Sequence, residues 1–207
     1  MTRLPDELER RIVHASGTVV PAIYLAGLLT YEQLQWLLIA GSLLAGALEI
    51  VRLWVGLDWP IFDRLTREYE QDSIAGYALY VFGGTIAALL FAPELAIPAM
   101  LMLTIADPVS GIASPGNTGR VKPIPVLALT FLTCVGVSLL AWAVALEGLT
   151  AEAVVLASLA ATIADGVFWQ YGDVVVDDNL GIPLGAAVAG WVGWELLPDV
   201  AIALPIG

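Results

Sequence analysis

Acidic residues stand where two apolar runs of the sequence end or begin. Asp107 follows the apolar run Met100–Ala106, and Asp177-Asp178-Asn179 stands directly before the last apolar run. Where apolar runs cross a membrane, a carboxylate at their edge is usually a ligand, a proton carrier or a member of an ion pair. Carboxylate and amide oxygens are hard ligands, which Mg²⁺ accepts together with phosphate oxygens and water. We expect Asp107, Asp177 and Asp178 to hold a metal, although Asp177-Asp178-Asn179 taken alone is also typical of a helix N-terminus.

A stretch rich in glycine, with two cations, follows Asp107. Its glycines and cations are Gly111, Gly116, Gly119, Arg120 and Lys122. Backbone N–H groups and cations in such a stretch can surround a phosphate group. Gly111 and Gly116 have P-loop spacing, but Asn117 stands where the P-loop lysine belongs and no strand precedes, so the P-loop reading fails. An unrelated phosphate-binding loop and a flexible turn between two helices both remain open.

Three further positions could carry chemistry or structure. Asp165 lies near the end of an apolar run, as Asp107 does, and both roles are open for it. Glu49 and Arg52 are three residues apart, so they share one helix face and form either an ion pair or part of a polar site. His14, the only histidine, could be a general base, a phosphate donor or a structural hydrogen bonder.

The elements that must position these residues are membrane helices. The chain has 207 residues, 59% hydrophobic and 14% charged, with a mean hydropathy of +0.85. A soluble domain is nearer half apolar and a quarter charged, so this composition argues against one. Seven apolar stretches are long enough to mark: 15–29, 34–56, 74–92, 95–112, 124–146, 151–168 and 181–197. They predict an all-α integral membrane protein, a single domain over 1–207 made of about seven transmembrane helices.

The distribution of charge predicts the orientation of this bundle. In a seven-span arrangement all eight cations fall on one side, and the loops 30–33, 93–94 and 147–150 on the other side carry none. Positive charge marks the cytoplasmic side, so we expect the N-terminus inside, the C-terminus outside and the polar site facing the cytoplasm across the cell membrane. The net charge of −12 argues against a nucleic-acid partner.

Four stretches, in order along nearly the whole chain, carry a resemblance to a known family. They are Glu9-Arg10-Arg11-Ile12-Val13-His14-Ala15-Ser16-Gly17, then Arg67-Glu68-Tyr69-Glu70 followed by Gly76, then Ala106-Asp107-Pro108-Val109-Ser110-Gly111, and Asp177-Asp178-Asn179-Leu180-Gly181-Ile182-Pro183-Leu184. The last is close to D-D-N-x-x-I-P-L and is the most specific. Together they resemble the dolichol kinase and phytol kinase family of CTP-dependent polyprenol kinases, which is related to phosphatidate cytidylyltransferases.

The resemblance implies a reaction and a set of site residues. It implies transfer of the γ-phosphoryl group of CTP to the hydroxyl of an isoprenoid alcohol in the membrane, with Mg²⁺ or another divalent cation. The implied catalytic residues are Asp107, Asp178, Glu70 and His14; the nucleotide-binding residues are Arg120, Lys122, Gly111, Gly119, Asn179 and Arg67; the metal ligands are Asp107, Asp177 and Asp178. A homo-oligomer is compatible with this reading.

The sequence departs from the family in three places and leaves rival functions open. Ala106 replaces the usual glycine, Asp165 stands where a glutamate is expected, and the segment after Lys122 lacks the family's glutamate-glycine-serine stretch. The closest alternative is a cytidylyltransferase that makes a CDP-activated lipid from the same CTP and metal. A transporter of ions or protons that uses Asp107 and Asp165 is a rival from another class, but the gathering of charge at one face argues against it.

Overall fold

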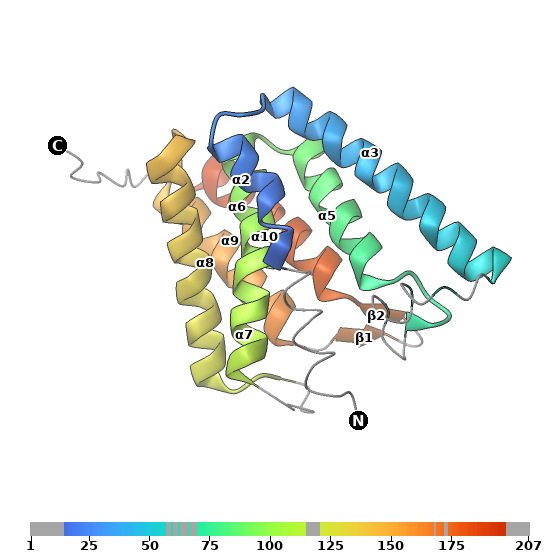
Figure 1. Cartoon of the computed structure of the whole chain (residues 1–207). Helices are drawn as coiled ribbons and strands as arrows, with labels where there is room; N and C mark the ends of the chain where they lie inside the picture. The colour runs from blue at the N-terminus through green and yellow to red at the C-terminus, as the bar shows by residue number, and fades with distance from the viewer. Residues whose placement is uncertain are drawn as a thin grey trace.

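The computed structural model describes residues 15–56, 59, 62, 66, 70–114, 121–167, 169–171 and 174–197, most of them helical (Figure 1). The helices are α2 (Val19–Leu25), α3 (Tyr31–Ile50), η1 (Val51–Val55), α5 (Gly76–Leu90), α6 (Pro93–Leu101), η3 (Met102–Ala106), α7 (Asp107–Ala113), α8 (Ile124–Ala145), α9 (Ala151–Gly166) and α10 (Asp178–Leu196). The two η elements are π-helical turns. Each of the seven predicted apolar stretches contains a helix, which confirms the helical reading of the sequence.

Among the described residues, three helices are long and apolar enough to cross a membrane. They are Tyr31–Val55, Pro93–Ala113 and Ile124–Ala145, and the apolar helix Gly76–Leu90 is shorter. Large apolar side chains also cover outward faces, including Leu43 (72% exposed) on α3 and Leu132 (64% exposed) on α8. Exposed apolar area of this kind suits contact with lipid better than contact with water. Seven spans and their orientation stay a prediction.

The chain around Asp107 stays helical although a proline follows this residue directly. The described chain is helical without interruption from Pro93 to Ala113, through α6, η3 and α7. The π-helical turn Met102–Ala106 ends immediately before Asp107 and Pro108. Pro108 lacks a backbone N–H, and its ring crowds the carbonyl four residues earlier in a regular helix. The wider turn accommodates the proline without ending the helix.

A small β-hairpin between α9 and α10 is a second departure from the predicted all-helical fold. Its strands are β1 (Trp169–Tyr171) and β2 (Val174–Val176), antiparallel with Trp169 opposite Val176. The helix α9 accordingly ends at Gly166, before the predicted boundary at residue 168. Three consecutive valines favour a strand because branched side chains fit a pleated backbone.

Two sets of contacts define opposite ends of the helical bundle. At one end the start of α8 meets the end of α9: Val121 bridges Val167, and the Lys122 N–H donates to the Gly166 carbonyl at 2.9 Å. At the other end, Leu95, Leu149, Ala153 and Val154 form a separate apolar cluster. The main core lies between them, built around fully buried side chains of α3, α6, η3, α8 and α10: Leu34, Ile97, Met100, Met102, Cys134 and Ile182.

The helix α10 packs closely against α5 and α9 because glycines line its contacts. A Cβ on Gly83 of α5 would lie 2.8 Å from Pro183 Cγ, and one on Gly193 would lie 2.7 Å from the backbone N of Ala153. Real Cβ atoms do not approach so closely, so each glycine sets how near the helices come. This packing fixes the first turn of α10, which carries Asp178, beside α5.

Candidate metal centre

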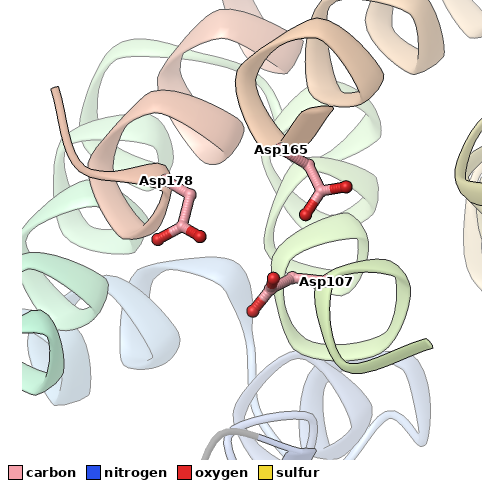
Figure 2. Close-up of side chains that lie close together, drawn as sticks. All are labelled: Asp107, Asp165 and Asp178. Carbon is pink, nitrogen blue, oxygen red and sulfur yellow. The ribbon is translucent and has the colours of Figure 1, made fainter. Parts of the chain in front are cut away.

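Three carboxylates from three helices meet at the end of the bundle where α8 begins and α9 ends. Asp107 is the first residue of α7, Asp165 the penultimate residue of α9 and Asp178 the first residue of α10. One oxygen from each lies within 4.8 Å of the others, and the three side chains surround a shared space (Figure 2). Asp165 is buried, and the other two are partly buried. Carboxylates this close repel one another when ionised, and either a shared cation or a proton on one of them relieves the repulsion.

A lysine compensates part of this charge from one side. The Lys122 ammonium lies 2.7 Å from Asp165 Oδ1 and donates to Ser110 Oγ at 2.9 Å. Ser110 in turn donates to Asp165 Oδ2 at 2.6 Å, and Thr130 Oγ1 lies 3.4 Å from the same oxygen. Asp165 is thus held in one orientation by groups from α7, from α8 and from Lys122, two residues before α8. Three carboxylates face one ammonium, which can balance the charge of only one of them.

In the first turn of α10, the side chains of Asp177, Asp178 and Asn179 have different roles. Asp177 is the N-cap: its Oδ1 accepts from the Asn179 backbone N–H at 2.9 Å and from the Asn179 side-chain amide at 2.6 Å. The same amide nitrogen lies 3.3 Å from Asp178 Oδ1. The cap fixes the start of the helix, and Asp178 is then directed to the cluster. Asp177, predicted as a metal ligand, is therefore not among the three clustered carboxylates.

The donor set of the cluster suits a small hard cation. Mg²⁺ binds oxygens at about 2.0–2.1 Å, so two ligands on opposite sides of one ion are about 4.2 Å apart. A spread of up to 4.8 Å is close to that span, and small side-chain rotations bridge the difference. Mg²⁺ usually keeps several waters and uses only one or two carboxylates beside phosphate oxygens. Asp107, Asp165 and Asp178 thus fit the metal that the sequence predicts, with Asp165 in the place given to Asp177.

Glu49 and Arg52 form the ion pair that their spacing predicts. Arg52 Nη2 lies 2.6 Å from Glu49 Oε2, and both side chains are nearly buried. The pair also binds the chain beyond η1: Arg52 donates to the carbonyls of Glu70, Gln71 and Ser73. Its role in this structure is to join the end of α3 and η1 to the segment before α5.

The remaining predicted residues fall into three groups. His14, Arg67, Gly119 and Arg120 lie outside the described residues. Gly111 lies inside the helix α7, so the stretch in which a phosphate-binding loop or a flexible turn is expected is helical through Ala113. Glu70 is buried, at 2% exposure, with its Oε1 beside Gly76 at the start of α5. A catalytic role for Glu70 stays a prediction.

Two residues that contact Asp165, namely Ser110 and Thr130, could hardly be predicted from the sequence as neighbours of the cluster. Ser110 follows Asp107 by three residues, which places both on one helix face, and this spacing could have suggested its part. Thr130 lies in the apolar helix α8, where its hydroxyl also bonds the Val126 carbonyl at 3.0 Å. A threonine hydroxyl in such a helix usually bonds only the carbonyl four residues earlier, so the sequence does not indicate that Thr130 is near the cluster.

Comparison of the chain with protein-family models, with characterised proteins and with solved structures finds no match. The resemblance to polyprenol kinases therefore rests on the four sequence stretches alone. The contacts around Asp107, Asp165 and Asp178 are a separate observation, made without reference to any relative.

Proposed function

We propose that this protein is a membrane-embedded kinase that transfers the γ-phosphoryl group of CTP to the hydroxyl of an isoprenoid alcohol at the cytoplasmic face. The observation that carries the proposal is the convergence of Asp107, Asp165 and Asp178, from three helices, next to the cation Lys122. Two of these residues, Asp107 and Asp178, belong to the sequence stretches that resemble the polyprenol kinases.

The residues of the cluster suit phosphoryl transfer because that reaction depends mainly on positioning and on charge stabilisation. Asp107, Asp165 and Asp178 would hold a divalent cation, which neutralises charge on the triphosphate when bound. The Lys122 side chain is 20% exposed, so its ammonium can contact a phosphate oxygen while Ser110 keeps Asp165 in place. Arg120, Arg67 and Gly119 are further candidates for phosphate contacts.

The acceptor must give up a proton during this reaction. The bond between the γ-phosphorus and the oxygen that links it to the β-phosphate breaks, and a bond from the alcohol oxygen to the γ-phosphorus forms. The hydroxyl proton passes to a base, for which Glu70 and His14 are the candidates from the sequence. The products are the isoprenyl phosphate and CDP.

The position of the cluster also suits an acceptor that resides in the lipid. Apolar side chains remain exposed on the surfaces of α3, α5 and α8, where only lipid would cover them in a membrane. An isoprenoid tail lies in that same medium, so only its hydroxyl needs to reach the polar end of the bundle. A soluble acceptor has no need for a site built on such helices.

A labelling experiment tests the proposal directly. Purified protein in lipid nanodiscs is incubated with Mg²⁺, CTP labelled at the γ-phosphorus and a panel of isoprenoid alcohols of different length. We expect labelled isoprenyl phosphate and an equal amount of CDP, both lost with EDTA and in Asp178→Asn. Label released as pyrophosphate, with cytidine on a lipid phosphate, would identify a cytidylyltransferase instead. Absence of both products with every acceptor would contradict the proposal.

A further inference from the structure

A buried ion pair holds the segment that precedes α5. The Glu49 carboxylate, 5% exposed, accepts from Arg52, from the Tyr77 hydroxyl and from the Ala75 backbone N–H, the last at 3.0 Å. Arg52 donates to three backbone carbonyls between residues 70 and 73. Side chains at the end of α3 and in η1 thus fix the backbone on both sides of the turn 71–74. Gly76, which follows Ala75, is held in position together with this backbone.

Gly76 lies against the side chain of Asn179. A Cβ at this position would be 2.8 Å from Asn179 Nδ2 and 3.4 Å from Glu70 Oε1. Gly76 is not one of the glycines with positive φ in the described chain, so its backbone would accept any residue. Space is therefore the reason for a glycine here, and the space is taken by the Asn179 amide.

The Asn179 amide leads to the metal cluster. It donates to Asp177 at 2.6 Å and lies 3.3 Å from Asp178 Oδ1. Asn179 is itself 3% exposed, so its amide has little room to turn. Of the two contacts, the longer one to Asp178 is the weaker, and a displaced amide would lose it first.

We propose that Gly76, held in place by Glu49 and Arg52, is a positioning residue for the metal ligand Asp178. The close approach of its backbone keeps the Asn179 amide against Asp178, and this contact orients the carboxylate toward Asp107 and Asp165. The inference rests on the metal site of the proposed function and deepens it. It gives a role in the site to the Glu49–Arg52 pair, which lies on a different helix from all three carboxylates.

Binding of Mn²⁺ alone, followed by electron paramagnetic resonance of the purified full chain, tests the inference without any turnover. In Gly76→Ala the new methyl group must displace the Asn179 amide. Loss of a group that orients a metal ligand typically lowers metal affinity 10- to 100-fold. We expect the Kd for Mn²⁺ to rise about tenfold in Gly76→Ala. An unchanged Kd in a folded Gly76→Ala protein would overturn the inference.

Two matched glycine variants separate positioning from general packing. Gly136→Ala adds a methyl group in α8 where no atom lies within 4 Å, so it should leave the Kd unchanged and should not lower the melting temperature. Gly193→Ala adds one at the far end of α10, 2.7 Å from backbone atoms of α9. It should lower the melting temperature and leave the Kd for Mn²⁺ unchanged. A tenfold higher Kd for Mn²⁺ in Gly193→Ala as well would show that the effect of Gly76→Ala comes from general helix packing, and it would overturn the inference.

Arg52→Lys decides the matter if Gly76→Ala does not fold. A single ammonium cannot make the paired contacts of the guanidinium to Glu49 and to the 70–73 carbonyls. We expect a higher Kd for Mn²⁺ in Arg52→Lys; a wild-type Kd would overturn the inference. A wild-type protein that binds no Mn²⁺ would overturn it together with the metal site. Mn²⁺ binding without phosphorylation of any alcohol would contradict the proposed kinase activity but not the role of Gly76 in orienting Asp178.

Discussion

Lys122 and Asp165 are 43 residues apart in the sequence and form an ion pair in which Nζ lies 2.7 Å from Oδ1. The Asp165 side chain is 1% exposed and the lysine 20%. The Lys122 backbone N–H also binds the end of α9, through the Gly166 carbonyl. Backbone and side chain of one residue thus join the start of α8 to the end of α9, and they place the only cation described near the carboxylate cluster.

The first prediction separates the structural part of Lys122 from its part in binding. Lys122→Met leaves Asp165 buried without its partner, and breaking a buried pair costs about 3 kcal/mol or more. The melting temperature should therefore fall in Lys122→Met and recover in the double variant Lys122→Met, Asp165→Asn, since the buried carboxylate that lost its partner is then removed as well. Thermal unfolding of the single and double variants measures this. A double variant less stable than Lys122→Met would show that the pair is not coupled.

A second prediction concerns which carboxylates bind the metal. Asp165→Asn and Asp178→Asn each remove a charged ligand and should abolish Mn²⁺ binding and turnover. Asp177→Asn keeps an oxygen that can accept the cap hydrogen bond, and asparagine caps helices as well as aspartate does. We expect this variant to retain both activities within a fewfold. Mn²⁺ titrations of the three variants check this, and loss of binding in Asp177→Asn alone would restore the ligand set expected from the sequence.

Recognition of the nucleotide gives a third prediction. Arg120→Ala should raise the KM for CTP and leave the KM for the alcohol nearly unchanged, because the triphosphate arrives from solvent and the tail from lipid. One charge-assisted hydrogen bond contributes about 1.5–3 kcal/mol, which corresponds to a loss of about tenfold to a hundredfold in kcat/KM. Steady-state kinetics with each substrate varied in turn measure both constants. Equal increases in the two KM values would point to a folding defect.

Orientation in the membrane is tested by cysteine labelling of whole cells. Cys134, the only cysteine, is buried and is first replaced by alanine. Asp72 and Glu147 are both exposed, the first before α5 at the cluster end and the second after α8 at the opposite end. A maleimide that cannot cross membranes should label Glu147→Cys in intact cells and Asp72→Cys only after lysis. The reverse pattern would place the carboxylate cluster outside.

Local patterns in the sequence predict much of the fold, whereas the site depends on contacts between distant segments. Apolar runs mark every helix, and the edges of two runs single out Asp107 and Asp178. The sequence also marks Asp165 as a candidate, but no local pattern decides that it, rather than Asp177, completes the cluster. That choice depends on α9 ending beside the start of α8, and on the N-cap hydrogen bonds that occupy Asp177.

Departures of a different kind come from the backbone. A proline such as Pro108 breaks a regular α-helix, and sequence rules describe only that cost. They do not describe the π-helical turn Met102–Ala106, which precedes Pro108 and relieves the crowding there. The hairpin was not predicted either, because its strands Trp169–Tyr171 and Val174–Val176 have three residues each. Such strands are too short for the alternating pattern of apolar and polar residues by which a strand is recognised in a sequence.

The π-helical turn before Asp107 also sets the rotational phase of the helix that carries it. A single π turn holds one residue more than an α turn, and each residue of an α-helix turns the chain by about 100°. The residues of α6 and those of α7 therefore follow two helical repeats offset by one position. A deletion of one residue within Met102–Ala106 would merge them into one regular repeat and would bring the Pro108 ring back against the carbonyl four residues earlier. A deletion between Asp107 and Ser110 would instead rotate Ser110 by about 100° away from its partners, so the number of residues in this helix is constrained on both sides of Asp107.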